Sequence, residues 1–143
     1  MSVFDKFKRN APVTPKNLRD VIRSMEKNEI VMTTVKISFA APDDCKLGGK
    51  PYLPANFEWP TFKSADDGIA RPLSFFCQVN LTKVKPYDKE NVLPKTGMLY
   101  FFYECGSSTW GFDPADNGAA RVFYFENTDG FAPLDLPENL AKD

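Results

Sequence analysis

Gly97-Met98-Leu99-Tyr100-Phe101-Phe102-Tyr103-Glu104 is the stretch of sequence that decides the fold of this chain. It is apolar on both of the faces that a β-strand presents, and the runs 72–80 and 120–126 have the same character. Strands of this kind belong in the middle of a sheet that is covered on both sides. Turn signals between the runs, such as Asp116-Asn117-Gly118, are spaced as in an antiparallel meander. The sequence therefore predicts three central strands of one antiparallel sheet.

A helix is expected before these strands. Thr14 can cap it, Pro15 suits its first position, and apolar residues then recur at offsets of three and four, which predicts an amphipathic helix over about 15–28. Residues 30–39 alternate between apolar and polar instead, which predicts a half-buried strand. Residues 40–70 collect proline and glycine without a sustained period, which indicates a long ordered surface loop that can include a short strand. The apolar face of the helix comprises Leu18, Val21, Ile22 and Met25.

Length and composition fit a single domain. The chain has 143 residues, of which 43% are hydrophobic, and a domain of this size buries roughly 68% of the surface of its unfolded chain. We predict one α+β domain over 1–143, in which the N-terminal helix packs on a mainly antiparallel, twisted β-sheet of about five strands. Its parts are an N-terminal helical region at 1–29, a β-rich body at 30–136 and a tail at 137–143.

Charge and apolar run length argue against two classes of partner. Lys plus Arg number 18 and Asp plus Glu number 19, so the net charge of −1 gives no general attraction to nucleic acid or to anionic lipid. The longest apolar run is far shorter than the roughly 20 residues that span a bilayer. The N-terminus also lacks the apolar core of a signal peptide. We therefore expect no nucleic-acid partner, no membrane association and a cytoplasmic location.

Residue counts also bear on the chemistry that the chain can perform. It contains no histidine, which removes the commonest general base and the commonest zinc ligand. Cys45, Cys77 and Cys105 form an odd set without close spacing, so neither a disulfide framework nor a paired-cysteine metal site is expected. Cys77 shares a strand face with apolar residues, which predicts a buried, inert thiol with a raised pKa. We expect no catalytic residue, no metal and no cofactor.

The pair Gly48-Gly49 invites comparison with a phosphate-binding loop. Such a loop needs a glycine five positions before Gly49 and a serine or threonine after Lys50, where this chain has Asp44 and Pro51. The two glycines instead indicate a tight turn with positive φ angles, which glycine adopts without steric cost. A cradle for a ligand is the less favoured alternative.

Polar side chains at two other places could either bind a ligand or hold a turn. Asp113 and Asn117 match part of a calcium-binding loop, but Tyr124 stands where the bidentate glutamate is needed, so successive turns are the better interpretation. Gln78 and Asn80 share one face of a predicted strand, and buried amides need several hydrogen-bond partners. They either fasten the loop around the glycine pair, which we favour, or line a ligand pocket.

Six motifs occur in a fixed order along the chain. In this order, over roughly residues 40–136, they resemble the YwqG-like family of bacterial cytoplasmic proteins, which are grouped as a domain of unknown function. The resemblance implies a β-rich α+β fold and no established activity. Members are often about twice as long, with a second half that weakly echoes the first, so a two-fold homodimer is expected to stand in for that half here. The motifs are 47–54 (Leu-Gly-Gly-Lys-Pro-Tyr-Leu-Pro), 58–60 (Glu-Trp-Pro), 72–81, 93–102, 110–114 (Trp-Gly-Phe-Asp-Pro) and 121–125 (Arg-Val-Phe-Tyr-Phe).

A non-enzymatic module that binds another protein is the preferred hypothesis for the function. Residue types enriched at binding hot spots occur at Trp59, Arg71, Trp110, Phe112 and Arg121. A binding face is favoured if Trp110 and Phe112 lie on a loop and are partly exposed, and disfavoured if both are buried. The rival hypothesis is a histidine-free enzyme or small-ligand site that uses Asp113, Gln78 and Arg121. A third possibility is an immunity-type protein that neutralises a toxin. The candidate residues for ligand or partner binding are Gly48, Gly49, Trp59, Arg71, Gln78, Asn80, Trp110, Asp113 and Arg121.

Overall fold

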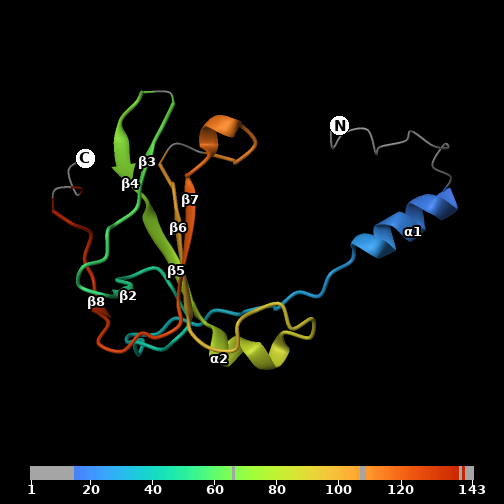
Figure 1. Cartoon of the computed structure of the whole chain (residues 1–143), viewed down its shortest axis with the longest axis horizontal. Coiled ribbons are helices and arrows are strands. Elements are labelled where there is room, and N and C mark those ends of the chain that lie inside the picture. Colours follow the sequence, from blue (N-terminus) through green and yellow to red (C-terminus); the bar gives the residue numbers. More distant parts are fainter. Residues whose placement is uncertain (1–14, 66, 107–108, 139, 141–143) are drawn as a thin grey trace, which may run out of the picture.

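The computed structural model describes residues 15–65, 67–106, 109–138 and 140, with side chains from Leu18 onward. Residues 1–14 of the predicted N-terminal helical region, with the predicted cap Thr14, lie outside the described residues, as does most of the predicted tail. The main element is a four-stranded antiparallel sheet with the strand order β1-β5-β6-β7 (Figure 1). In chain order the elements are α1 (Pro15–Met25), β1 (Lys46–Leu47), β2 (Tyr52–Leu53), β3 (Thr61–Lys63), β4 (Ala70–Pro72), β5 (Ser74–Asn80), α2 (Leu81–Val84), η2 (Lys85–Tyr87), β6 (Met98–Tyr103), η3 (Pro114–Asp116), β7 (Ala120–Phe125) and β8 (Ala132–Pro133).

The three predicted central strands are confirmed. The runs 72–80, 97–104 and 120–126 contain β5, β6 and β7, which pair in antiparallel order. Gly97, just before β6, has a φ of +96°, and a Cβ added to it would lie 2.5 Å from the carbonyl oxygen of Phe125. Only glycine fits so close to the neighbouring strand. The fold is thus α+β with a mainly antiparallel sheet, of four strands where about five were expected.

One face of this sheet, called here the inner face, carries the core of the domain. Its central residues on β6 are Met98, Tyr100 and Phe102, which are 3%, 0% and 1% exposed. Side chains from the segments 49–63 and 131–136 pack on this face, and these segments lie to the left of the sheet in Figure 1. The Phe102 ring contacts four other aromatic rings. Each such pair stabilises the fold by about 0.5–1.5 kcal/mol beyond its area burial.

The opposite face, called here the outer face, was expected to be covered as well, but its residues are half-buried or exposed in the described chain. Residues opposite one another on paired strands share a face, so Leu99 and Phe101 lie on the outer face of β6. Neither is buried. Leu47 on β1 and Val122 on β7, at the two edges of this face, are 56% and 55% exposed. The outer face comprises Leu47, Cys77, Val79, Leu99, Phe101, Tyr103, Val122 and Tyr124.

The predicted N-terminal helix is present as α1, and it ends at Met25 rather than near residue 28. Its expected packing on the sheet is not seen. The apolar side chains of α1 are all exposed, and Figure 1 shows the helix well away from the sheet. Two apolar surfaces, the outer face and one side of α1, therefore stand unpaired in the same chain.

The strand predicted at 30–39 is wrong, because these residues form no strand. Val31, Val35 and Phe39, on the apolar side of the alternation, are exposed. Alternation states which side chains would share a face, but a strand also needs a neighbour with free backbone groups. The segment instead runs as a linker past α2 and η2, where the Asn28 side chain donates a hydrogen bond to Glu90 Oε1 at 3.2 Å.

Residues 40–70 form a loop with short strands, close to the expectation. β1 joins the main sheet beside β5, while β2 pairs with β8 and β3 pairs with β4 in two separate two-stranded sheets. The backbone N–H of Leu134 also donates to the carbonyl of Pro51 at 2.8 Å. These pairings hold the covering segments of the inner face against each other, although few of their residues are in regular strands.

Candidate functional site

The glycine pair forms a turn at the end of β1. Gly48 and Gly49 have φ angles of +63° and +70°, which confirms the predicted positive-φ turn. The backbone N–H of Gly48 donates to the carbonyl of Phe76 on β5 at 2.8 Å. A Cβ at either position would meet no atom within 4 Å. Glycine is therefore required here by the backbone conformation and not by a lack of space.

The Gln78 side chain fastens the loop that leads into this turn. It has no exposed surface, and its Nε2 donates to the carbonyls of Pro42 and Asp44 at 3.0 and 2.9 Å. Its Oε1 accepts the backbone N–H of Tyr52 at 3.3 Å. The amide thus bonds the chain both before and after the glycine pair, which is the arrangement that we favoured over a pocket lining.

Asn80 makes a second fastening and also begins a helix. Its Nδ2 donates to the carbonyl of Asp43 at 2.7 Å. Its Oδ1 accepts the backbone N–H groups of Thr82 and Lys83, at 2.9 and 3.3 Å, and so caps α2. A side-chain acceptor of this kind satisfies N–H groups that a helix leaves free at its start. Both the oxygen and the nitrogen of the amide therefore make hydrogen bonds within the fold.

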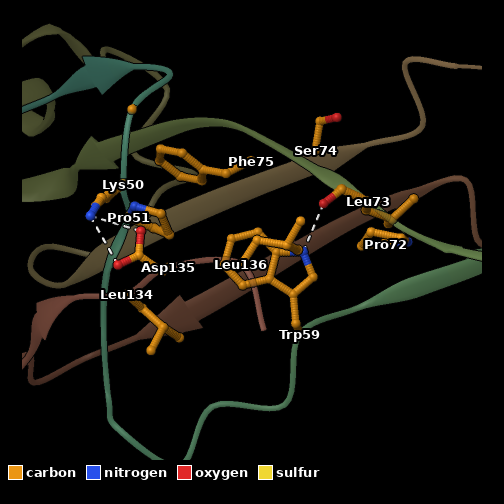
Figure 2. A pocket seen from close by; sticks show the side chains of 11 residues that line it. Lys50, Pro51, Trp59, Pro72, Leu73, Ser74, Phe75, Leu134, Asp135 and Leu136 are labelled. Carbon is orange, nitrogen blue, oxygen red and sulfur yellow. Dashed lines mark hydrogen bonds and ion pairs between the residues drawn. The ribbon is translucent and has the colours of Figure 1, made fainter. Parts of the chain in front are cut away.

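Gly49 and Trp59 meet in a cleft between the covering segments and the first residues of β5, shown in Figure 2. The cleft has a volume of about 270 Å³. The Trp59 indole N–H donates to the carbonyl of Leu73 at 2.8 Å, so this donor is not free for a ligand. At the rim, Lys50 Nζ and Asp135 Oδ1 lie 2.7 Å apart, and both side chains are mostly exposed. The cleft is lined by Gly49, Lys50, Pro51, Trp59, Pro72, Leu73, Ser74, Phe75, Leu134, Asp135 and Leu136.

Trp110 and Phe112 lie on the loop between β6 and β7 and are 79% and 90% exposed. The carboxylate of Asp116 accepts the backbone N–H of Gly111, between the two aromatic residues, at 2.8 Å. Residues 110–113 are called here the aromatic loop. The rings of Trp110 and Phe112 thus face solvent, and the Asp116 side chain holds the backbone between them.

Asp113 holds the same turn from its other end. Its Oδ1 accepts the backbone N–H of Ala115 at 2.8 Å and so caps η3, which confirms the predicted turn. Asp113 and Arg121 are exposed, whereas Gln78 is completely buried. These three side chains therefore do not form one water-accessible pocket, which the rival small-ligand hypothesis requires.

Arg71 lies on β4, apart from the aromatic loop in the sequence. One of its guanidinium nitrogens is 2.6 Å from Asp67 Oδ2. This hydrogen-bonded pair lowers the pKa of Asp67. Arg71 therefore has a role in holding the β3–β4 hairpin.

Burial shifts the pKa of one group in the centre of each face of the sheet. Burial raises the pKa of Tyr100 on the inner face to about 12, and its hydroxyl has no hydrogen-bond partner among the described residues. On the outer face, burial raises the pKa of the Cys77 thiol, with a smaller contribution from Cys45. Cys77 is half-buried rather than buried, but the direction of its pKa shift agrees with the prediction.

No helix among the described residues is long and apolar enough to cross a membrane. No group of three or more Cys, Asp or Glu side chains within the same described ranges is placed as metal ligands would be.

Sequence reasoning paired Trp110 with Phe112 as a binding face if both are exposed on a loop, and both are exposed. It missed the ion pair of Lys50 with Asp135, since the two residues are 85 positions apart and no local pattern links them.

Comparison with known proteins gives a family and no activity. A family model described as "Domain of unknown function (DUF1963)" matches residues 45–140. This region begins just before β1 and includes the whole main sheet, the cleft and the aromatic loop. No curated protein matches the chain. Because the family model covers more than half of its length, the chain belongs to the DUF1963 family, a domain of unknown function.

Proposed function

We propose that this chain is a non-enzymatic module that binds another protein, and that it is a YwqG-like protein of the bacterial cytoplasm. The finer family assignment is supported by the order of the motifs between Leu47 and Phe125, all within the matched region 45–140. The cytoplasmic assignment is supported by unpaired cysteines, since reduced thiols are usual in that compartment.

The exposure of the aromatic loop is the observation that carries the binding proposal. Trp110 and Phe112 are among the most exposed large apolar residues in the described chain. Tryptophan is enriched at binding hot spots, and an exposed ring gains most when a partner covers it. The hydrogen bond from Gly111 to Asp116 orders the loop before any partner arrives, which lowers the entropy lost on binding.

A small-ligand site in the cleft of Figure 2 is the second candidate. Gly49 and Trp59 line it, and the exposed ion pair of Lys50 and Asp135 stands at its rim. Its volume of about 270 Å³ is below the roughly 300 Å³ at which ligand pockets begin. The indole N–H is already bonded within the fold. We therefore rank this site below the aromatic loop.

A photo-crosslinking experiment in cells tests the proposal. The crosslinking amino acid benzoyl-phenylalanine replaces Phe112 in one chain and Tyr87 in a matched control, because both are exposed aromatic residues and Tyr87 lies in η2. We expect an adduct with one protein from Phe112 and not from Tyr87. Binding of that purified protein should then weaken more than tenfold in Trp110→Ala, as for a hot-spot residue.

Two results would contradict the binding proposal. If Phe112 and Tyr87 give the same adducts, the captured protein is cross-linked only because it is abundant in the cell. An adduct whose purified protein binds wild type and Trp110→Ala equally would remove the aromatic loop as the binding surface. If the purified chain instead binds small molecules and the variant Ser74→Trp, which narrows the cleft, abolishes this binding, the second candidate is favoured.

We also propose that α1 packs on the outer face, as the fold prediction has it. The support is that both surfaces are apolar and exposed, and that α1, at 11 residues, is about 16 Å long, close to the length of β6. The linker between α1 and β1 has enough residues to span the sheet even when only partly extended.

Two matched substitutions in α1 test this packing. Alanine favours a free helix, so Ile22→Ala should leave stability unchanged or raised if α1 is free, and lower it by about 2–4 kcal/mol if α1 is packed. Arg23→Ala, on the opposite side of α1, should have little effect in either case. Chemical unfolding of both variants gives the answer. Equal stability of the two would contradict the packing.

A further inference from the structure

The two edges of the main sheet are built differently. The β1 edge is short and irregular, since β1 has two residues and is followed at once by the Gly48-Gly49 turn. Beside it, β5 contains an irregularity between Phe75 and Cys77 that shifts the register. Short strands and bulges are the usual means by which a sheet edge avoids pairing with another chain. This edge is protected.

The β7 edge has none of these protections. β7 runs for six residues, and each of them is paired in regular register with β6, from Ala120 opposite Tyr103 to Phe125 opposite Met98. It contains no proline and no lysine, and Arg121 is its single charged residue. Among the described residues no strand lies on its other side. A regular, apolar edge of this length is a template for pairing with another strand.

The inner face is also less buried at the β7 edge than at its centre. Phe123 and Phe125 on β7 point to the inner face together with Tyr100 and Phe102 on β6. The two β6 residues are completely buried, whereas the two β7 residues are only half-buried. The inner face is thus less well covered at the β7 edge, and a further strand there would bury more of both rings.

We propose that β7 pairs antiparallel with β7 of a second copy of this chain across a two-fold axis, so that the two sheets of four strands form one sheet of eight. The inner-face residues of β7 are the odd-numbered ones, Arg121, Phe123 and Phe125. The inner faces of the two copies therefore lie on the same side only if odd-numbered residues pair with odd-numbered residues, so that the two numbers of each pair sum to an even number. The central register then places Phe123 opposite Phe123, Val122 opposite Tyr124 and Arg121 opposite Phe125. An isologous contact of this kind closes at two copies.

The side chains of β7 are the reason for choosing a second copy as the partner. In this register every cross-strand pair from Arg121 to Phe125 is favourable in both directions. Aromatic pairs and aromatic pairs with β-branched residues each stabilise a sheet, and a guanidinium beside an aromatic ring adds a cation–π contact. The strand is therefore complementary to itself. This pairing does not involve the aromatic loop, so it is independent of the proposed partner-binding function.

Sedimentation of the full chain over a concentration series tests the pairing, with two matched lysine variants. Val122 and Leu47 lie on the same face with nearly equal exposure, but on opposite edges of the sheet. We expect a dimer of the 16.1 kDa chain for wild type and for Leu47→Lys. Val122→Lys should weaken dimerisation at least tenfold, because two lysines would face each other diagonally across the axis. Thermal unfolding of each variant shows whether it is folded.

Cross-linking provides a second measurement that does not depend on a loss of association. In the double variant Val122→Cys with Tyr124→Cys, each new cysteine lies opposite one on the second copy, so mild oxidation should give a covalent dimer. Wild type, with its three native cysteines, is the control. A monomer at all concentrations, or no excess of covalent dimer over wild type, would overturn the pairing. Equal weakening by both lysine variants would also overturn it and point to contact through the outer face.

Discussion

The two faces of β6 carry side chains of the same kind and have opposite surroundings. Met98, Tyr100 and Phe102 on the inner face are almost completely buried, whereas the alternate residues Leu99 and Phe101 on the outer face are not. Hydropathy therefore does not distinguish the two faces. The difference teaches that an apolar pattern shows that a surface favours burial, but does not show which segment covers it.

Specific polar contacts explain why the inner face is the covered one. The Trp59 indole bonds the Leu73 carbonyl, and the buried Gln78 amide bonds the chain around β2. Leu134 bonds the carbonyl of Pro51 in the same layer. These bonds place the covering segments over the inner face. On the outer face, the hydroxyls of Tyr103 and Tyr124 bond the carbonyls of Thr109 and Thr96, which lie in the loops that flank β6. The comparison of the two faces can be tested by substitution, as follows.

The largest difference is expected between neighbouring phenylalanines of β6. Phe102→Ala should lower the free energy of unfolding by about 3–5 kcal/mol, because it removes a ring that contacts four others and leaves a cavity. Phe101→Ala, one position earlier on the outer face, should cost about 1 kcal/mol if this face is uncovered and about 3–5 kcal/mol if α1 packs on it. Urea unfolding measures both. Similar losses for the two variants would show that the outer face is covered in solution.

Alkaline unfolding tests the burial of Tyr100. Its pKa of about 12 in the folded chain lies above the ordinary value of 10, so the protonated form is favoured by folding. The stabilisation is complete below pH 10 and is lost as the pH rises from 10 towards 12, by about 3 kcal/mol in total. Tyr100→Phe should be at least as stable as wild type at pH 7, because it removes a buried hydroxyl that has no described partner, and should not show this alkaline loss. Parallel pH profiles for the two chains would contradict the burial.

The glycine turn beside the inner-face cleft is the next test. Gly49→Val should lower stability by about 1–3 kcal/mol, because a β-branched residue is strained at a φ of +70° while the added atoms meet nothing. Gly49→Asn is the matched control, since asparagine tolerates positive φ. Melting temperatures decide the point. If both variants have the melting temperature of wild type, the backbone conformation does not explain the presence of glycine at this position.

The smallest effect is expected on the outer face itself. Val122→Thr keeps the shape and the β-branching of the side chain, and Val122 is 55% exposed, so stability should change by no more than about 0.5 kcal/mol. A loss of about 2 kcal/mol or more is expected instead if α1 covers Val122 or if a second copy packs against it. Measuring the loss at two protein concentrations separates these cases, because only the second depends on concentration.

Sequence reasoning could predict the local conformation of parts of the candidate site, but not which of these parts lie together in the folded chain. The turn at Gly48-Gly49 and the cap formed by Asp113 follow from residue types a few positions apart, and both are confirmed. The partners of Gln78 lie 26 to 36 positions away, so only their necessity could be stated and not their identity. The cleft that joins Gly49 to Trp59 is likewise produced by packing and has no local signature.

The sequence alone determined the three central strands, the helix in α1 and the positive-φ turn, because periodicity, capping and glycine conformation act over a few residues. The tertiary structure alone decided that 30–39 is not a strand and that Trp110 and Phe112 face solvent. It also decided which side of β6 became the core. The two sides are chemically alike, so the choice depends on hydrogen bonds between segments far apart in the chain.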